Sequence, residues 1–135
     1  MSDSGPAEDR RAVEPIVSVS MLAPGLVKVT VRGPFGSGAL AVSRQLADDV
    51  LALEPTDVVL DLSRARCDPT TVPVLALLRR YAARRGVRIG VTSTSRVALG
   101  LLRRAGQVDQ FRVVRLADLP MVVPRASPAA DQEAS

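Results

Sequence analysis

Two adjacent threonines, Thr70 and Thr71, lie in the stretch RCDPTTVPVL (residues 66–75), where an apolar segment is followed by a helical pattern. Because Pro73 is tolerated only in the first turn of a helix, the helix N-cap is expected at Thr70 or Thr71. A threonine hydroxyl there could cap free N–H groups, which is worth ~1 kcal/mol. It could instead carry a phosphate, which the helix dipole would stabilise and Asp68 would repel. The residues leave both possibilities open, a structural cap and a phosphorylation switch.

The composition excludes several kinds of chemistry. The 135-residue chain has no histidine and one cysteine, so it lacks the commonest general base and cannot form a Ser-His-Asp or Cys-His site. A single thiol cannot build a thiolate metal cage, and no metal or cofactor is expected. Cys67 is expected to be a small, buried apolar residue at the end of a strand. We therefore predict a binding module and not an enzyme.

Positive charge is concentrated in the second half of the chain. Residues 64–125 contain 13 arginines and three aspartates. Nucleic-acid binding is one interpretation of this excess, and arginines scattered over solvated helix faces are the other. The chain has only one tyrosine, two phenylalanines and no tryptophan, so platforms for base stacking are absent. Nucleic acid is accordingly not the partner that we predict.

The apolar periodicity predicts the fold class α/β, with one mixed β-sheet flanked by helices in the order β-β-α-β-α-β-α-β. Strands are expected over 16–22, 26–31, 58–60, 87–91 and 111–114, and helices over 39–53, 73–85 and 96–105. The first two strands form a hairpin, and the alternating second half implies right-handed crossovers between parallel strands. Binding sites in such sheets favour the loops at the carboxyl ends of the strands, and the stretch that contains the two threonines is one of these loops.

The chain is predicted to form one domain over residues 16–119, between disordered tails at 1–15 and 120–135. No apolar run approaches the ~20 residues of a membrane helix, and the polar N-terminus lacks an apolar signal core. A single cysteine also fits a reducing compartment. We therefore expect a cytoplasmic protein without a membrane partner.

The helix predicted at 73–85 has two different faces when it is drawn at 100° per residue. Its buried side is expected to carry Val74, Leu77, Leu78 and Tyr81, and its opposite side Val72, Ala76, Arg79, Arg80 and Ala83. Small side chains between arginines leave a low strip that a partner helix could approach. The same pattern is compatible with a plain solvent face.

The segment VVLDLSRARCDPTTVPVLALLRRYAARRGVRIGV (residues 58–91) resembles the centre of STAS domains, the anti-sigma factor antagonist family. In that family a strand ending in L-D-L-S is followed by a short loop, by D-S-[ST]-G and by a helix rich in Leu and Arg. The downstream segment RVALGLLRRAGQVDQFRV (residues 96–113) is similar to the final helix of the family. The resemblance covers about residues 16–114.

This resemblance implies a protein that binds an anti-sigma factor, often also a serine/threonine kinase, and is released when a Ser or Thr of the motif is phosphorylated. If Asp68 matches the aspartate of the motif, Pro69 takes the acceptor position, Thr70 the second hydroxyl and Thr71 the glycine. In an alignment without a gap from Asp61, Thr70 takes the acceptor position and Thr71 the second hydroxyl. Thr70 is therefore the first phosphorylation candidate and Thr71 the second. The resemblance places the partner-binding surface around this helix start, where Asp68, Val72, Ala76, Arg79, Arg80 and Ala83 are the candidate contact residues.

A ligand- or nucleotide-binding regulatory module of the same fold, without phosphorylation, is the main alternative. The loop GPFGSG (residues 33–38) follows a strand and precedes a helix, as phosphate-binding loops do. It lacks the G-x-G-x-x-G and Walker patterns, and turn and entry glycines explain it better.

Overall fold

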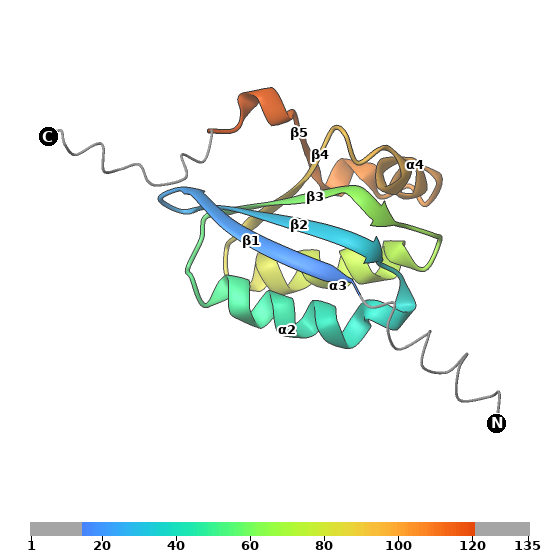
Figure 1. Ribbon diagram of the computed structural model, residues 1–135, viewed down its shortest axis with the longest axis horizontal. Coiled ribbons are helices and arrows are strands. Elements are labelled where there is room, and N and C mark those ends of the chain that lie inside the picture. The colour runs from blue at the N-terminus through green and yellow to red at the C-terminus, as the bar shows by residue number, and fades with distance from the viewer. Residues whose placement is uncertain (1–14, 121–135) are drawn as a thin grey trace, which may run out of the picture.

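A computed structural model describes residues 15–120, which form one five-stranded β-sheet with helices on one of its faces (Figure 1). The predicted tails lie outside the described residues, apart from Pro15 and Pro120. The elements in chain order are β1 (Ile16–Ala23), β2 (Leu26–Pro34), η1 (Ser37–Ala39), α2 (Leu40–Leu51), β3 (Asp57–Arg66), α3 (Thr71–Arg84), β4 (Arg88–Thr92), α4 (Arg96–Arg104), η2 (Val108–Gln110), β5 (Arg112–Val114) and η3 (Leu116–Asp118). The predicted fold class and element order are confirmed.

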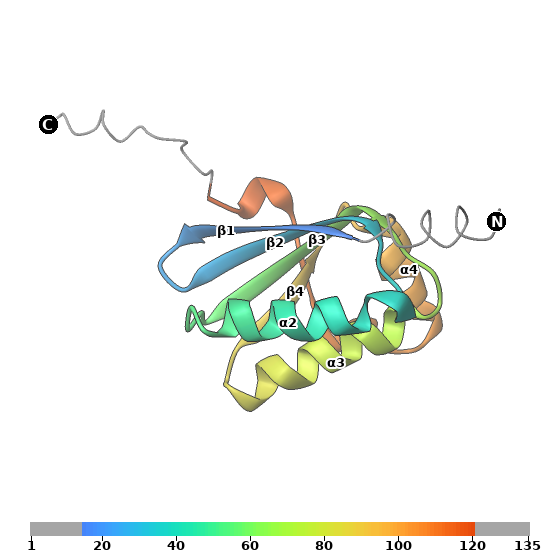
Figure 2. The same ribbon diagram turned by 60° about the horizontal axis from the view of Figure 1, so that its bottom comes forward.

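The strands lie in the sheet in the same order as in the chain, β1-β2-β3-β4-β5. The hairpin of β1 and β2 is antiparallel, and the three remaining pairs are parallel. Each parallel connection moves one place in the same direction, and such crossovers are right-handed, so their helices belong on the same face. Accordingly α2 and α3 cover one face, and the short η3 lies on the other side of the sheet (Figures 1 and 2). We refer to this second side as the open face.

The core lies between the sheet and the helices and is built from alternate strand residues. Val27, Val29 and Val31 of β2 are at most 1% exposed, and Val58, Leu60 and Leu62 of β3 join the same cluster. Aliphatic side chains of the helices complete the cluster. With few aromatic residues in the chain, branched aliphatic side chains supply the burial that stabilises the fold, at ~25 cal/mol per Å² of apolar surface.

Several predicted boundaries are wrong, including those of α2 and β3. The helix expected over 39–53 is α2, which ends at Leu51, and Leu53 is 46% exposed beyond its end. The strand expected over 58–60 is β3, which continues to Arg66. It extends past the buried apolar residues because β2 keeps pairing with it as far as Pro34 and Arg66. Main-chain pairing of this kind leaves no hydrophobic pattern in the sequence.

The buried side of α3 also differs from the prediction. The helix starts at Thr71, and Leu77 and Tyr81 are only half-buried. Its buried residues are Thr71, Val72, Val74, Leu75, Leu78 and Ala82. The buried arc is wide because α3 contacts both α2 and α4 as well as the sheet.

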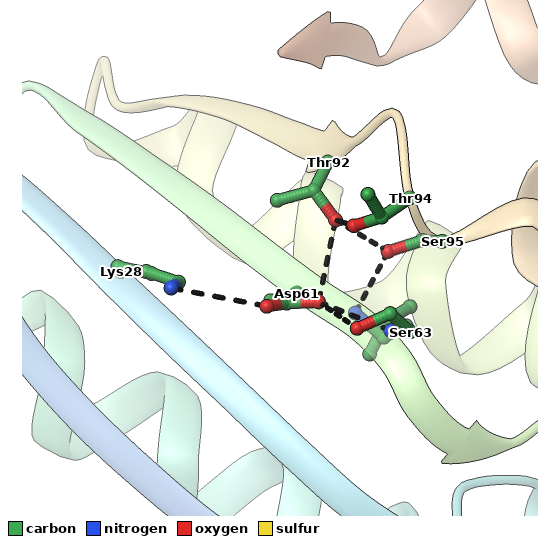
Figure 3. Close-up of polar contacts among 7 residues, drawn as sticks. Lys28, Asp61, Ser63, Thr92, Thr94 and Ser95 are labelled. Carbon is green, nitrogen blue, oxygen red and sulfur yellow. Dashed lines mark hydrogen bonds and ion pairs between the residues drawn. The ribbon is translucent and has the colours of Figure 1, made fainter. Parts of the chain in front are cut away.

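The strand β3 contains an extra residue near Leu62 and Ser63. Thr30 of β2 pairs with Asp61, but Arg32 pairs with Arg64. Two residues of β3, Leu62 and Ser63, therefore lie opposite one residue of β2. Such a β-bulge interrupts the ladder. Two N–H groups at the bulge find side-chain acceptors: Leu62 N donates to Ser95 Oγ at 2.8 Å, and Ser63 N donates to Asp61 Oδ1 at 3.1 Å. Ser95 immediately precedes α4, so the first bond ties the start of that helix to β3 (Figure 3).

Asp61 is at the centre of this polar network on the open face (Figure 3). It is only 7% exposed, and it accepts the Ser63 hydroxyl at 2.7 Å and that of Thr92 at 3.4 Å. Lys28 Nζ lies 3.8 Å from Asp61 Oδ2. Burial by itself would raise the pKa of Asp61, but the hydrogen bonds from Ser63 and Thr92 and the charge of Lys28 outweigh it, so the pKa lies below its usual value.

The variant Asp61→Ala is expected to lower the free energy of unfolding by about 2 kcal/mol, because it leaves the Ser63 donors without an acceptor. Asp61→Asn keeps an acceptor oxygen and should cost less. Since the folded-state pKa is lowered, the carboxylate contributes stability above the ordinary aspartate pKa of about 3.9, and this contribution is lost as the pH falls through the folded-state value. Denaturant titration should therefore show that the free energies of unfolding of wild type and Asp61→Asn become more alike as the pH is lowered. A difference that stays constant down to about pH 3 would contradict this role.

Candidate functional site

The predicted loop lies between β3 and α3, at the carboxyl end of β3. The loop that follows β2 lies beside it, because Phe35 N donates to the carbonyl oxygen of Arg66 at 2.9 Å and so extends the pairing of β2 and β3. Residues 35–38 and 67–70 are therefore neighbours at one edge of the sheet. This is the edge at which the topology predicted a binding site.

Asp68 organises the start of α3. Its carbonyl oxygen accepts Thr71 N at 2.8 Å, and its Oδ1 accepts Thr70 N, also at 2.8 Å. Thr70 is the N-cap residue, as predicted, but its hydroxyl makes no capping bond to the helix. The structural-cap interpretation of this hydroxyl is therefore wrong: the carboxylate of Asp68 binds the N–H group of Thr70, and the hydroxyl has other partners.

The two threonine hydroxyls have opposite environments. Thr71 is 0% exposed; its Oγ1 donates to the carbonyl oxygen of Phe35 and accepts Asp68 N at 3.0 Å. Of the two phosphorylation candidates, Thr71 is therefore the enclosed one, because its hydroxyl is hydrogen-bonded between the two loops. A kinase needs an accessible acceptor oxygen, so Thr71 is ruled out as a phosphorylation candidate in this conformation.

Thr70 is exposed, and its hydroxyl lies between the two loops. Its Oγ1 accepts Ser37 N at 2.8 Å and donates to Asp68 Oδ1. The contact with Ser37 was not predicted. The available signal was the short GSG segment after β2, since loops that follow neighbouring parallel strands meet at the same edge.

Gly36 allows this close approach. A Cβ atom added to it would collide with Thr70 Oγ1 and lie 2.9 Å from Asp68 Oδ1. The turn interpretation of the glycines in GPFGSG is thus supported by a steric requirement at Gly36 and by the positive φ of 89° at Gly33. The nucleotide interpretation of this loop loses one donor, because the N–H of Ser37 is already bound to Thr70.

The predicted partner-binding residues are separated by the structure into surface and core. Asp68, Arg80 and Ala83 are exposed, and Ala76 and Arg79 are half-buried. Val72 is 8% exposed and belongs to the hydrophobic core. The prediction that it lies on the side of the helix opposite the buried one is therefore wrong. Its place is explained by the wide buried arc of α3. The remaining residues continue along the helix surface from the loop that contains Thr70.

Cys67 is half-buried and packs against the core, as predicted. Burial raises the pKa of its thiol, and the negative charge of Asp68 raises it further. The thiol is therefore protonated at neutral pH, which makes it a poor nucleophile.

Other kinds of site find little support. Residues 15–120 contain no cluster of metal-binding side chains, and none of their helices is long and apolar enough to span a membrane. A cleft of about 480 Å³ opens on the far end of the sheet, between the hairpin turn, β4, β5 and η3. Its arginines, Arg88 and Arg112, both bind Asp57, with N···O distances of 3.0 and 2.9 Å. These cations are thus engaged with the protein's own carboxylate.

Thr71→Val is expected to lower the free energy of unfolding by about 1–3 kcal/mol, because it keeps the side-chain volume but leaves Asp68 N–H and the Phe35 carbonyl without their buried partner. Thr70→Val is its matched control and should cost less than about 1 kcal/mol, since the groups that it releases can bind water. Thermal or denaturant unfolding of the two variants measures this difference. Equal losses would contradict the distinct environments of the two hydroxyls.

No protein-family model and no curated protein sequence matches the chain. Several solved structures do. The anti-sigma factor antagonist SpoIIAA in its unphosphorylated form has a TM-score of 0.61 at 11% identity, covering 76% of this chain and 91% of its own; the phosphorylated form of this Bacillus protein also matches. An anti-sigma factor antagonist from Mycobacterium paratuberculosis has a TM-score of 0.61 at 20% identity, with coverages of 78% and 90%. A sulfate transporter family protein from Wolinella succinogenes has a TM-score of 0.58 at 20% identity, with coverages of 73% and 84%.

These similarities run over nearly the whole of the described chain, while the sequences have diverged to 20% identity or less. They establish the architecture that the L-D-L-S strand and the following helix had indicated. The chain has the STAS fold, the fold of the anti-sigma factor antagonists.

Proposed function

We propose that this protein is an anti-sigma factor antagonist, which binds an anti-sigma factor or a serine/threonine kinase of that type and is switched by phosphorylation of Thr70. The observation that carries the proposal is the exposed position of Thr70 at the N-cap of α3, at the carboxyl edge of β3. The fold supports the proposal, since two of the similar structures are anti-sigma factor antagonists.

The proposed docking surface consists of Asp68, Thr70, Ala76, Arg79, Arg80 and Ala83. It begins at the exposed loop residues and continues along the outer side of α3. Ala76 and Ala83 are small, so a partner helix can approach the backbone of α3 between the arginine side chains. Arg80 is exposed and available for a carboxylate of the partner.

In the proposed switch, Thr70 Oγ1 attacks the γ-phosphorus of ATP held by the partner kinase. A new O–P bond forms, the bond to the leaving ADP breaks, and the kinase takes the hydroxyl proton. The product loses the hydrogen bond that the Thr70 hydroxyl donates to Asp68. It also places a dianion beside that carboxylate, so repulsion should change the conformation of this loop and weaken docking.

A ligand- or nucleotide-binding STAS module without phosphorylation is the alternative. The cleft on the open face is where such a ligand would bind: its walls include the apolar Leu26, Val59 and Leu119, and an anionic ligand would compete with Asp57 for Arg88 and Arg112. This cleft lies at the opposite end of the strands from Thr70, since Leu26 and Asp57 are the first residues of β2 and β3. Substitutions at the two ends of the sheet therefore distinguish the two functions: those near Thr70 should affect the switch, and those in the cleft should affect ligand binding.

Incubation with the cognate anti-sigma kinase and ATP should place one phosphate on Thr70, as located by mass spectrometry of tryptic peptides. Thr70→Val should abolish this phosphate, and Thr71→Val should retain it in the fraction that is folded. Phosphate on another residue, or on none, would contradict the switch.

The docking surface predicts that Ala76→Glu and Ala83→Glu each weaken binding to the anti-sigma factor by at least about tenfold, which corresponds to ~1.4 kcal/mol. A bulky carboxylate would keep the partner away from the helix and remain unpaired in the interface. Ala117→Glu is the matched control, because Ala117 is exposed in η3 on the other side of the sheet. Titration calorimetry measures the affinities. Wild-type affinity in both helix variants would contradict the proposed docking surface. Loss of affinity in the control would show that the effect is not specific to α3.

A further inference from the structure

The strand β1 forms one edge of the sheet. It spans Ile16–Ala23 and pairs with β2 on one side (Figure 1). Within residues 15–120 no strand pairs with its other side. An edge strand of this length presents a row of main-chain N–H and C=O groups that can pair with another chain.

The residues of β1 itself are not of the types that usually protect an edge strand. Its sequence, IVSVSMLA, contains no charged residue and no proline. Proteins commonly shield exposed edges with lysines, prolines or very short strands. The opposite edge of this sheet follows that rule, because β5 has three residues and begins with Arg112. The difference indicates that β1 is suited to pairing with another strand.

Apolar side chains are also exposed on β1. Ile16, Val19 and Met21 are 65%, 43% and 53% exposed. They are three of the eight large hydrophobic residues that are exposed in the described part of the chain. Val19 and Met21 pair with Val29 and Val27 of β2, which are at most 1% exposed, so the apolar row of the core continues uncovered onto the edge strand.

We propose that the edge of β1 binds the β1 strand of a second copy of this chain, antiparallel and with Val19 opposite Val19. In this register Val17 of each copy lies opposite Met21 of the other, and Ser18 lies opposite Ser20. The two five-stranded sheets then form one continuous ten-stranded sheet across a two-fold axis. Such an isologous pair closes on itself and leaves neither β1 edge exposed.

The strand matches itself, which selects a second copy over an unrelated segment. Val17, Val19 and Met21 share the helix side of the sheet, and Ser18 and Ser20 share the open face, as their partners in β2 show. The proposed register places apolar residues opposite apolar residues and hydroxyls opposite hydroxyls, and such cross-strand pairs contribute roughly 0.2–1 kcal/mol each. The absence of charge in β1 removes like-charge repulsion between identical strands. A shift by one residue would place Val17 opposite Ser20 and Ser18 opposite Val19, so that valine faces serine.

The proposed dimer is also compatible with the positions of the helices. A two-fold axis perpendicular to the sheet keeps the helices of both copies on the same face. The exposed side chains of Val19 and Met21 from both copies then lie next to each other, between the two α2 helices. The outer surface of α3 stays free, because α3 lies under the interior of the sheet and not beside β1 (Figure 2). The dimer is therefore independent of the proposed docking site.

Cysteine crosslinking tests the register in the full-length chain. In a Cys67→Ser background, Val19→Cys is expected to form a disulfide-linked dimer on mild oxidation, because residues opposite each other across an antiparallel pair have Cα atoms about 4.5–5.5 Å apart. Met21→Cys is the matched control: its two thiols would be offset by four residues, roughly 14 Å, which is too far for a disulfide. Crosslinking at position 21 equal to that at position 19 would overturn the register.

Sedimentation equilibrium tests the dimer itself. Val19→Lys would place two ammonium groups directly opposite each other and should weaken dimerisation at least about tenfold. Val113→Lys is its control, since Val113 is 50% exposed on the other edge strand, and should leave the dimer unchanged. A wild-type protein that remains a monomer at all concentrations, or equal effects of the two lysine variants, would overturn the proposal. Neither result bears on binding of an anti-sigma factor, which the α3 variants test separately.

Discussion

The buried hydroxyl of Thr71 connects the two loops on which the candidate site depends. It donates to the carbonyl oxygen of Phe35 after β2 and accepts the N–H of Asp68 after β3. Without this buried hydroxyl, both groups would lose their hydrogen-bond partner, which is costly. This constraint fixes the start of α3 against the end of β2. It also directs the preceding residue, Thr70, to the surface, with Ser37 and Asp68 as its neighbours.

The one-sided arrangement of helices explains the rest of the surface. Because each crossover moves in the same direction, α2 and α3 bury one face of the sheet and leave the other to polar groups and η3. On that open face the Asp61 network holds the β-bulge of β3 and the start of α4. Within residues 15–120, the side chains of Val19 and Met21 on β1 are left exposed beyond the helical layer. The proposed docking surface therefore lies on the helical layer, and the proposed dimer edge lies on the strand β1.

Much of the candidate site could be predicted from local sequence. Pro73 restricted the helix start to Thr70 or Thr71, and Asp68 was correctly placed beside the threonines. The contacts of Ser37 and Gly36 with Thr70 could not be predicted, since they join residues 33 or 34 positions apart. The exposure of Val72 was predicted wrongly because helical periodicity assumes one neighbour, whereas α3 packs against α2, α4 and the sheet.

The sequence by itself determined the element order and the fold class, because alternation with a period of 2 or 3.6 residues reflects which side of each element is buried. Its lack of histidine and its single cysteine excluded whole classes of catalysis. Only the tertiary structure decided which of two chemically identical neighbours is accessible: Thr71 is enclosed by the β2 loop, and Thr70 is not. The physical reason is that burial and the pairing of main-chain groups depend on segments that meet in space, and the local order of residues does not specify those meetings.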